Sequence, residues 1–368
     1  MTSIQMAQLA TYALYVAMAA LACAMTAFTL YLARLASGRE ARRVSESEAA
    51  RTHTDSPVLV TAGAARGDAV TGDSTTSDST TGDSTTGVTT GGHGREDVAT
   101  TPASAVAEGD RREPASGSLG MSLSWLGALF LVVSLALRGL SVSRVPVANL
   151  FEFAVAGATA TLLTYLVLAQ RRPLRWLGLF VVVPVLSVLG LALVAWYVPA
   201  AELAPALQSY WIAIHVPIAI ISIGIFTVAF CILLVQLGVE RRERQRAEGR
   251  APSTSRLGTL LDALPGAARL DRIAYSLNVA AFPLWTFTII AGAIWGQKAW
   301  GTYWSWDPKE VWTFVIWVLY AAYLHARATS GWKRRTSNVI AIAGYVAILL
   351  NTTVVNFFFS GLHSYSGL

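Results

Sequence analysis

The chain has 368 residues, of which 54% are apolar and only 14% are charged. This balance excludes an ordinary soluble domain and is typical of an integral membrane protein. The formal net charge of +6 does not indicate nucleic-acid binding, because the basic residues lie in short clusters at the ends of apolar stretches.

About eight stretches are apolar over the roughly 20 residues that a helix needs to cross a bilayer. We therefore predict an all-α integral membrane protein, a polytopic bundle of about eight transmembrane helices. The predicted spans lie near residues 8–34, 121–141, 150–169, 175–197, 211–238, 275–295, 311–328 and 337–359.

The first span, within an N-terminal segment of residues 1–37, has no basic leader and no convincing small-residue cleavage site. We interpret it as a retained transmembrane helix and not as a signal peptide. Basic clusters follow the first, third, fifth and seventh spans, at residues 34–43, 171–175, 241–246 and 333–335. Loops rich in Lys and Arg stay on the cytoplasmic side, so one alternating topology satisfies every cluster and places both termini outside. Arg138 and Arg144, in an outer loop, are the exceptions.

Residues 38–118 have a different composition, in which the run Thr71-Gly72-Asp73-Ser74-Thr75 recurs almost unchanged through residue 85. Such small polar residues cannot bury enough apolar surface to offset the entropy of ordering. We predict a disordered linker on the cytoplasmic side. Residues 119–368 then form one membrane domain.

Residues 295–312 contain five tryptophans between two apolar spans, and we predict an outward-facing Trp-rich loop. A dense cluster of large flat rings favours a platform for a planar apolar ligand. The alternative is an aromatic belt, since tryptophan collects at membrane interfaces without any ligand. The tryptophans are Trp295, Trp300, Trp304, Trp306 and Trp312.

Two histidines are predicted on the same side of the membrane as this loop. His215 lies in the first turn of the fifth span, on the same helical face as Trp211, and His363 follows the last span. Imidazole is a common axial ligand of haem iron. Each histidine alone is better explained as a polar interface residue, but the pair beside one aromatic loop favours haem ligation.

His325 lies about 15 residues into the seventh span, or roughly 22 Å from its outer end at 1.5 Å per residue. It is therefore too deep to share an iron with the outer histidines. Ionisable residues within membrane spans are usually functional. Alternatively, His325 is a residue at the inner end of the span, next to Arg327, that simply faces the lipid headgroups. The sequence favours neither interpretation over the other. A haem on His325 would need its second ligand from another subunit, or an open position.

Asp307, Pro308 and Glu310 form the pattern of a helix start, with Asp as N-cap, Pro as the first helical residue and Glu closing a capping box. Acid–base catalysis by this carboxylate pair is the weaker interpretation, and we predict no catalytic residue.

Taken together, these motifs resemble a known family. The segments 295–296 and 304–310, followed by His325, resemble the Trp-rich "WWD" signature of the haem-handling proteins of cytochrome c maturation. The similarity is greatest to the CcsA/ResC branch of system II, called CcsB in some bacteria. Residues 146–152 are similar to a further family segment, with Phe151 in place of the usual Tyr. The resemblance covers roughly residues 119–368 and leaves out the linker.

The resemblance implies an outer haem-binding site and a second, membrane-embedded histidine. The implied iron ligands are His215, His363 and His325, and the implied haem contacts are Trp211, Trp295, Trp300, Trp304, Trp306, Asp307 and Glu152. Haem b would be the bound substrate. The implied partners are a ResB-type membrane subunit, which would complete the coordination at His325, apocytochrome c and membrane lipid, with no nucleic acid.

The implied activity is transport of haem to the outer face of the plasma membrane and its covalent attachment to Cys-x-x-Cys-His apocytochromes c. The protein would then be a component of a cytochrome c synthase. One alternative is a haem chaperone or exporter that leaves ligation to another protein. The other is a transporter of a different apolar solute with an aromatic gate, which does not explain the paired outer histidines.

Overall fold

The structure is a computed structural model that describes residues 2–54, 115–200, 208–250, 255–329 and 331–363. By its internal contacts the chain divides into one compact unit, residues 1–42 with 113–368, and a second unit of residues 43–112. The first unit carries every candidate site residue.

The described part of the chain is helical and includes eight helices long and apolar enough to cross a membrane, which confirms the predicted fold class. These helices are α1 (Ser3–Thr54), α3 (Ala115–Ser141), α4 (Leu150–Arg171), α5 (Gly178–Ala195, after the short 3-10 turn η1, Arg175–Leu177), α6 (Ile212–Ala247), α8 (Ala267–Trp300), α9 (Pro308–Ala328) and α10 (Arg334–Thr352, continued by α11, Val354–Phe358). A short amphipathic helix, α7 (Arg256–Ala263), precedes α8.

Two edges of the predicted linker are wrong. Helix α1 continues to Thr54 and α3 already begins at Ala115, so residues 38–54 and 115–118 are helical. Residues 38–54 are rich in Ala, Glu and Arg, which are good helix formers, and extending a helix that already exists avoids the cost of nucleation. The remainder of the predicted linker, residues 55–114, lies outside the described residues.

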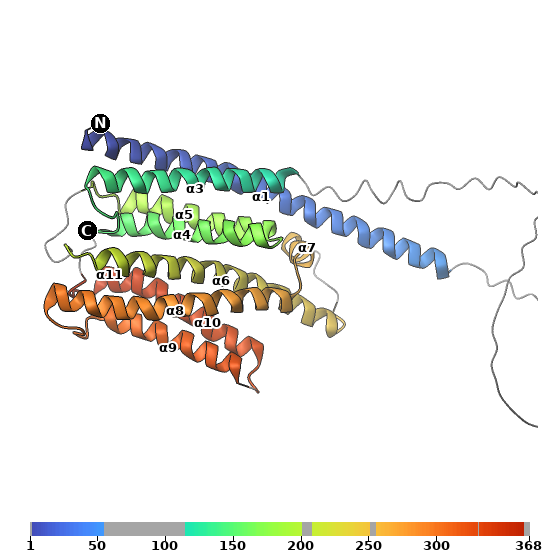
Figure 1. Cartoon of the computed structure of the whole chain (residues 1–368). Helices are drawn as coiled ribbons and strands as arrows, with labels where there is room; N and C mark the ends of the chain where they lie inside the picture. The colour runs from blue at the N-terminus through green and yellow to red at the C-terminus, as the bar shows by residue number, and fades with distance from the viewer. Residues whose placement is uncertain (1, 55–114, 201–207, 251–254, 330, 364–368) are drawn as a thin grey trace, which may run out of the picture. The chain divides into compact units, whose positions relative to one another are not determined.

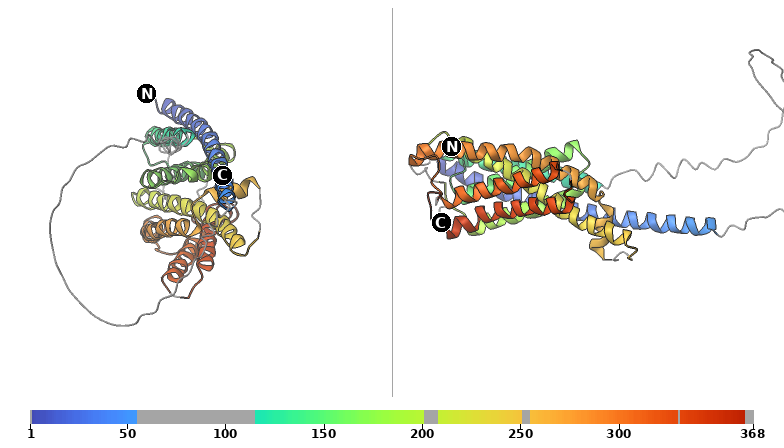
Figure 2. Two further views of the ribbon diagram at one scale, coloured as in Figure 1. Left: turned by 90° about the vertical axis from the view of Figure 1, so that its right-hand side faces the viewer. Right: turned by 90° about the horizontal axis from the view of Figure 1, so that it is seen from below.

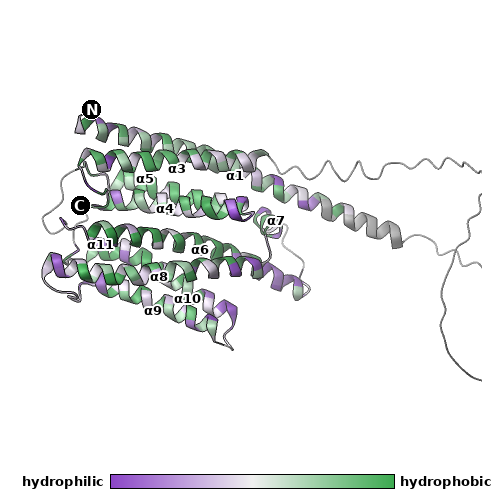
Figure 3. Cartoon of the chain, viewed as in Figure 1, coloured by the Kyte–Doolittle hydropathy of each residue, from purple (hydrophilic) through white to green (hydrophobic). Residues whose placement is uncertain are grey.

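Helices α6 and α8 pack along each other more extensively than any other pair, and α4 joins this pair to α3 and α5. On the other side, α9 and α10 pack against each other (Figures 1 and 2). The spans are predominantly hydrophobic along their length and carry their hydrophilic residues toward the ends (Figure 3). The start of α6, the end of α8 and the start of α9 lie at the same end of the bundle (Figure 1).

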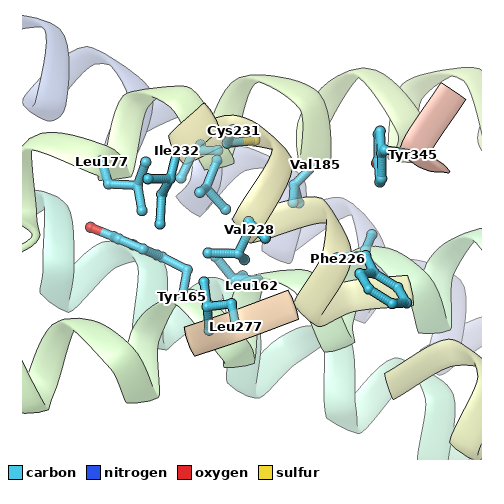
Figure 4. Close-up of a cluster of buried hydrophobic side chains, with 14 of the residues drawn as sticks. Leu162, Tyr165, Leu177, Val185, Phe226, Val228, Cys231, Ile232, Leu277 and Tyr345 are labelled. Carbon is cyan, nitrogen blue, oxygen red and sulfur yellow. The ribbon is translucent and has the colours of Figure 1, made fainter. Parts of the chain in front are cut away.

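The core between these helices is tightly packed (Figure 4). An ideal Cβ on Gly224 of α6 would stand 2.9 Å from the backbone carbonyl carbon of Ala160 in α4, so only glycine allows this approach. Nearby, the rings of Phe226 and Tyr320 stack with 3.8 Å between centroids. These contacts hold α6 rigidly against α4 and α9, and α6 in turn carries His215.

At the end of the bundle opposite the Trp-rich segment, a buried polar network joins α6, α8, α9 and α10. Asp271 accepts hydrogen bonds from Arg327 at 2.9 Å and from Asn338 at 2.9 Å. Asn338 also donates to Gln236 at 3.3 Å. A charge within a membrane span is costly unless it is paired, and here both charges are. The Arg327 guanidinium thus pairs with Asp271 between the helices and does not face the lipid headgroups.

Candidate functional site

The Trp-rich segment differs from the loop predicted over residues 295–312. Helix α8 continues through Trp300 and ends where Gly301 adopts a left-handed conformation with φ of 78°, and α9 begins at Pro308. Only residues 301–307 are non-helical. Trp295 and Trp300 therefore project from a rigid helix end, which fixes their rings better than a long loop would.

The start of α9 forms the capping box that the sequence predicts. Asp307 accepts the backbone N–H of Lys309 at 2.9 Å, and Oε2 of Glu310 accepts the backbone N–H of Asp307 at 3.2 Å. The same Glu310 oxygen accepts the N–H of Ser305 at 2.8 Å. These bonds hold residues 305–307 against the first turn of α9.

The Asp307 carboxylate also binds the C-terminal segment. Oδ1 lies 2.9 Å from Nδ1 of His363, and Oδ2 accepts the N–H of Leu362 at 2.6 Å. Burial raises the pKa of Asp307, but the hydrogen bond and charge of His363, with the backbone N–H groups, outweigh it and lower the pKa below its ordinary value. Asp307 is therefore an anion that can only accept. When His363 is neutral, Nδ1 therefore donates to this carboxylate and Nε2 carries the lone pair.

His215, on α6, has the same arrangement. Its Nδ1 lies 2.9 Å from the backbone carbonyl oxygen of Thr288 in α8. A carbonyl can only accept, so Nδ1 is the donor and Nε2 again has the free lone pair. Gly292, one turn further along α8, makes room for the ring, because a Cβ there would stand 2.7 Å from Cε1 of His215.

Trp295 brings the two histidines together. Its ring is nearly parallel to that of His215 at 6.1 Å and lies 5.6 Å from that of His363. Trp300 completes the cluster, 4.8 Å from His363 and 4.6 Å from Trp295. Trp295 is only 2% exposed, and its indole N–H has no hydrogen-bond partner within the described structure. Two histidines that are 148 positions apart in sequence thus share one aromatic neighbour.

Both histidines line one cavity of about 220 Å³. Its apolar wall comes from α6 and α8, and Trp304 and Tyr303 contribute from the connecting segment. The volume lies below the roughly 300–1,000 Å³ of typical small-molecule sites. A larger flat ligand would therefore extend beyond the cavity, whose lining includes Tyr303, a residue that is 62% exposed. The two free imidazole nitrogens and the aromatic walls fit an iron porphyrin.

The remaining predicted tryptophans lie around this cluster. Trp211 is the residue before α6; it contacts the group of Ile212 and Trp295, and its ring lies 5.3 Å from that of Tyr210 in a tilted arrangement. Trp306 has φ of 59° and reaches only the edge of Trp304, 5.9 Å away. Trp211 therefore packs against the cluster, whereas the side chain of Trp306 is largely exposed.

Glu152 is not among the residues that line the cavity, and the haem contact that the resemblance implies for it stays a prediction. Its fully buried carboxylate binds Arg138 at 2.9 Å, Arg144 at 2.8 Å and the backbone N–H of Ala148 at 2.8 Å. It thereby ties down the segment after α3, whose residues 147–149 line the cavity. The same pairs explain why two arginines are found at this end of the bundle, where the charge pattern predicts few.

His325 also lies away from the cavity. It is exposed on α9, near the opposite end of that helix, and its side chain is not part of the cavity lining. The sequence prediction that it cannot share an iron with the outer pair agrees with this position. Its exposure leaves it accessible to a neighbouring molecule in the membrane.

Two further residues of the cavity were not predicted. Lys309 lines the cavity, but in the sequence it reads only as a spacer within the capping box. Gly292 lines it as well, and no sequence pattern distinguishes it from the other glycines of the spans. Both line the cavity only because helices that are distant in the sequence pack beside them.

Comparison with known proteins places the chain in a family. Residues 145–363, more than half of the chain, match the family described as Cytochrome C assembly protein. The chain belongs to this family. The matched range includes both histidines of the cavity and ends at His363 itself.

Similar proteins include three that bear the name cytochrome c biogenesis protein CcsA. The one from Gloeobacter violaceus is 31% identical over 72% of this chain and 90% of its own length. The one from Microcystis aeruginosa is 31% identical over 68% and 88%, and that from a Picosynechococcus species is 32% identical over 68% and 87%. Together with the eight spans, these likenesses support a multi-pass membrane protein of the CcsA type with a role in cytochrome c biogenesis and haem handling.

Proposed function

We propose that this protein carries haem b to the outer face of the plasma membrane and holds it there between His215 and His363 for covalent attachment to apocytochromes c. One observation carries the proposal: both imidazoles are fixed with Nδ1 as donor, so both present Nε2 as a ligand beside the same aromatic wall. Haem is the substrate and not a resident cofactor.

In this proposal the protein contributes positioning. Attachment adds each cysteine S–H of the Cys-x-x-Cys-His motif across a haem vinyl C=C bond, which needs no net oxidant. Holding thiol and vinyl in near-attack geometry lowers the barrier by several kcal/mol. The two carboxylates nearest the cavity, Asp307 and Glu310, are occupied by the helix cap and by His363. We therefore assign no catalytic acid or base.

The outward orientation rests on charge. The basic clusters at residues 171–175, 241–246 and 333–335 lie at the ends of α4 and α6 and the start of α10, opposite the cavity. Cytoplasmic loops carry the excess of Lys and Arg. The cavity and both termini would then be outside, where c-type cytochromes receive their haem.

A ResB-type membrane subunit is the proposed partner. His325 is exposed at the surface of α9, so a partner helix can approach it and supply the second ligand for a haem on its way outward. Among the described residues, His215 and His363 cannot supply this second ligand, because the cavity that they line is far from His325 along the bundle.

A haem carrier that leaves ligation to another protein is the second candidate. It is favoured by the same commitment of the Asp307 and Glu310 carboxylates to the helix cap and to His363. Co-expression with the ResB-type partner and an apocytochrome discriminates between the two. Covalent haem on the cytochrome, detected by haem stain after denaturing electrophoresis, supports the synthase, whereas haem that co-purifies with this protein but never becomes covalent supports the carrier.

The test of the haem site is the absorption spectrum of the detergent-purified protein. We expect a Soret band with sharp reduced α and β bands, weakened in His215→Ala and in His363→Ala and absent in the double variant. When haem is added directly to the purified protein, the His325→Ala variant serves as a control and should keep the outer-site spectrum, since His325 does not line the cavity. Normal cytochrome maturation by the double variant would refute the proposal.

A further inference from the structure

Lys309 is a cation in the cavity that ligation by the two histidines does not use. It is the second residue of α9, its side chain is half-buried, and it lines the cavity together with both histidines. Its ammonium group has no hydrogen bond or ion pair to any residue that the structure describes. Such a group beside a membrane cavity is costly unless an anion joins it.

The neighbouring carboxylates are already committed. Asp307 accepts from Lys309 through the backbone N–H and not through the ammonium, and its other bonds go to His363 and Leu362. Glu310 accepts from the backbone N–H and hydroxyl of Ser305 and from the N–H of Asp307. The Lys309 ammonium feels the charge of Asp307 without a hydrogen bond to it, so its own donors remain available to a ligand.

Most of the residues that α9, α10 and α11 contribute to the cavity lining are polar. Thr313 on α9 accepts a hydrogen bond from Nδ2 of Asn351 on α10 at 3.3 Å, while the buried Oδ1 of Asn351 has no partner in the described structure. Asn356 lines the same side. Most of the lining residues on α6 and α8 are apolar, among them Val216, Ala219, Ile223 and Ile289. The cavity therefore suits a flat apolar ligand with a polar, anionic edge turned toward α9 and α10.

We propose that the Lys309 ammonium pairs with a carboxylate of the bound ligand, which for haem is a propionate. This inference rests on the proposed function. It makes Lys309 a residue that fixes the orientation of the disc. A haem turned within its plane would still reach both histidines, but it would move its vinyl groups away from the position where the thiols arrive. Pairing one propionate with one cation removes that freedom.

The test compares haem with its dimethyl ester, which has the same iron and ring but no propionate charge. Each porphyrin is titrated into the purified full-length protein, and the ratio of the two dissociation constants is measured. We expect the wild type to favour haem by about 10- to 100-fold, the range for a charge-assisted hydrogen bond. Lys309→Met should bring the ratio close to one, and Lys309→Arg should restore the preference. Lys298→Met, which removes an exposed lysine outside the cavity lining, is the matched control and should keep the wild-type ratio.

The outcomes separate this inference from the proposed function. Equal binding of both porphyrins by the wild type, with spectra that depend on His215 and His363, would overturn the role of Lys309 and leave the haem site intact. A preference that persists in Lys309→Met would overturn it as well. If neither porphyrin gave a histidine-dependent spectrum, the proposed function would fail and this inference with it.

Discussion

Replacing Gly292 by alanine tests the geometry at His215 without touching the ligand itself. The new Cβ would stand 2.7 Å from Cε1 and 3.0 Å from Nδ1 of the imidazole, whereas ordinary contacts begin at 3.4 Å. The ring must therefore retreat by about 0.7 Å, the difference between 3.4 and 2.7 Å. A retreat along the hydrogen bond would lengthen the 2.9 Å contact with the Thr288 carbonyl to about 3.6 Å, beyond the range of an N–H···O bond.

The cost arises from the role of that hydrogen bond. It selects the tautomer of His215 that leaves the lone pair on Nε2. Losing such an outer-shell partner typically lowers metal affinity about 10- to 100-fold, or about 1.4–2.7 kcal/mol. The helix itself should tolerate the change, since alanine is about 1 kcal/mol more favourable than glycine within a helix.

The assay is a haem titration followed by absorption. Gly157→Ala in α4 and Gly190→Ala in α5 are matched controls, because a Cβ at either position meets nothing within 4 Å. In a His215→Ala background, Gly292→Ala should have no further effect, since the group that it displaces is gone. Wild-type affinity and spectrum in the single Gly292→Ala variant would refute the assigned role of the Thr288 contact.

Two other substitutions test residues that hold the site in place without being proposed iron ligands. Asn is as good an N-cap as Asp, so Asp307→Asn should keep the start of α9 but remove the negative partner of His363. We expect haem affinity to fall about 10-fold with little change in melting temperature; an unchanged affinity would contradict the assignment. Glu152→Ala should instead leave Arg138 and Arg144 buried without their carboxylate, at a cost of about 3–5 kcal/mol. This should appear as a lower unfolding temperature in detergent, and a variant as stable as wild type would show that the network is not needed.

The number of spans was predictable because hydropathy alone determines it, whereas their edges were not. Residues 296–300 include Gly296, Gln297 and Lys298, so an apolar window ends at Trp295 although the helix continues. The end of α8 is set by Gly301, whose left-handed conformation stops the helix. Similarly, α1 continues past the apolar region because its charged residues are good helix formers.

Within the site, local chemistry was predictable and long-range pairing was not. The capping box follows from four consecutive residues, and the structure confirms it. The bond from His363 to Asp307 joins residues 56 positions apart, and no local pattern encodes it. Glu152 shows the same limit, because its partner Arg138 belongs to the preceding helix. A motif can thus mark a residue as special while its actual contacts depend on the packing of distant segments.

Asp307 shows how the two interpretations of the acidic pair can be reconciled. The sequence favours a helix cap over acid–base chemistry, and the capping bonds are present. Yet the same carboxylate also holds Leu362 and orients His363, so the cap and the ligand support are one structure. Any loosening of α9 at its first turn must therefore displace His363, while His215, fixed to a backbone carbonyl of α8, stays in place. The two proposed ligands are therefore held differently: His215 by a backbone carbonyl of a packed helix, and His363 by the side chain of Asp307. The Asp307→Asn variant should accordingly weaken binding through His363 alone.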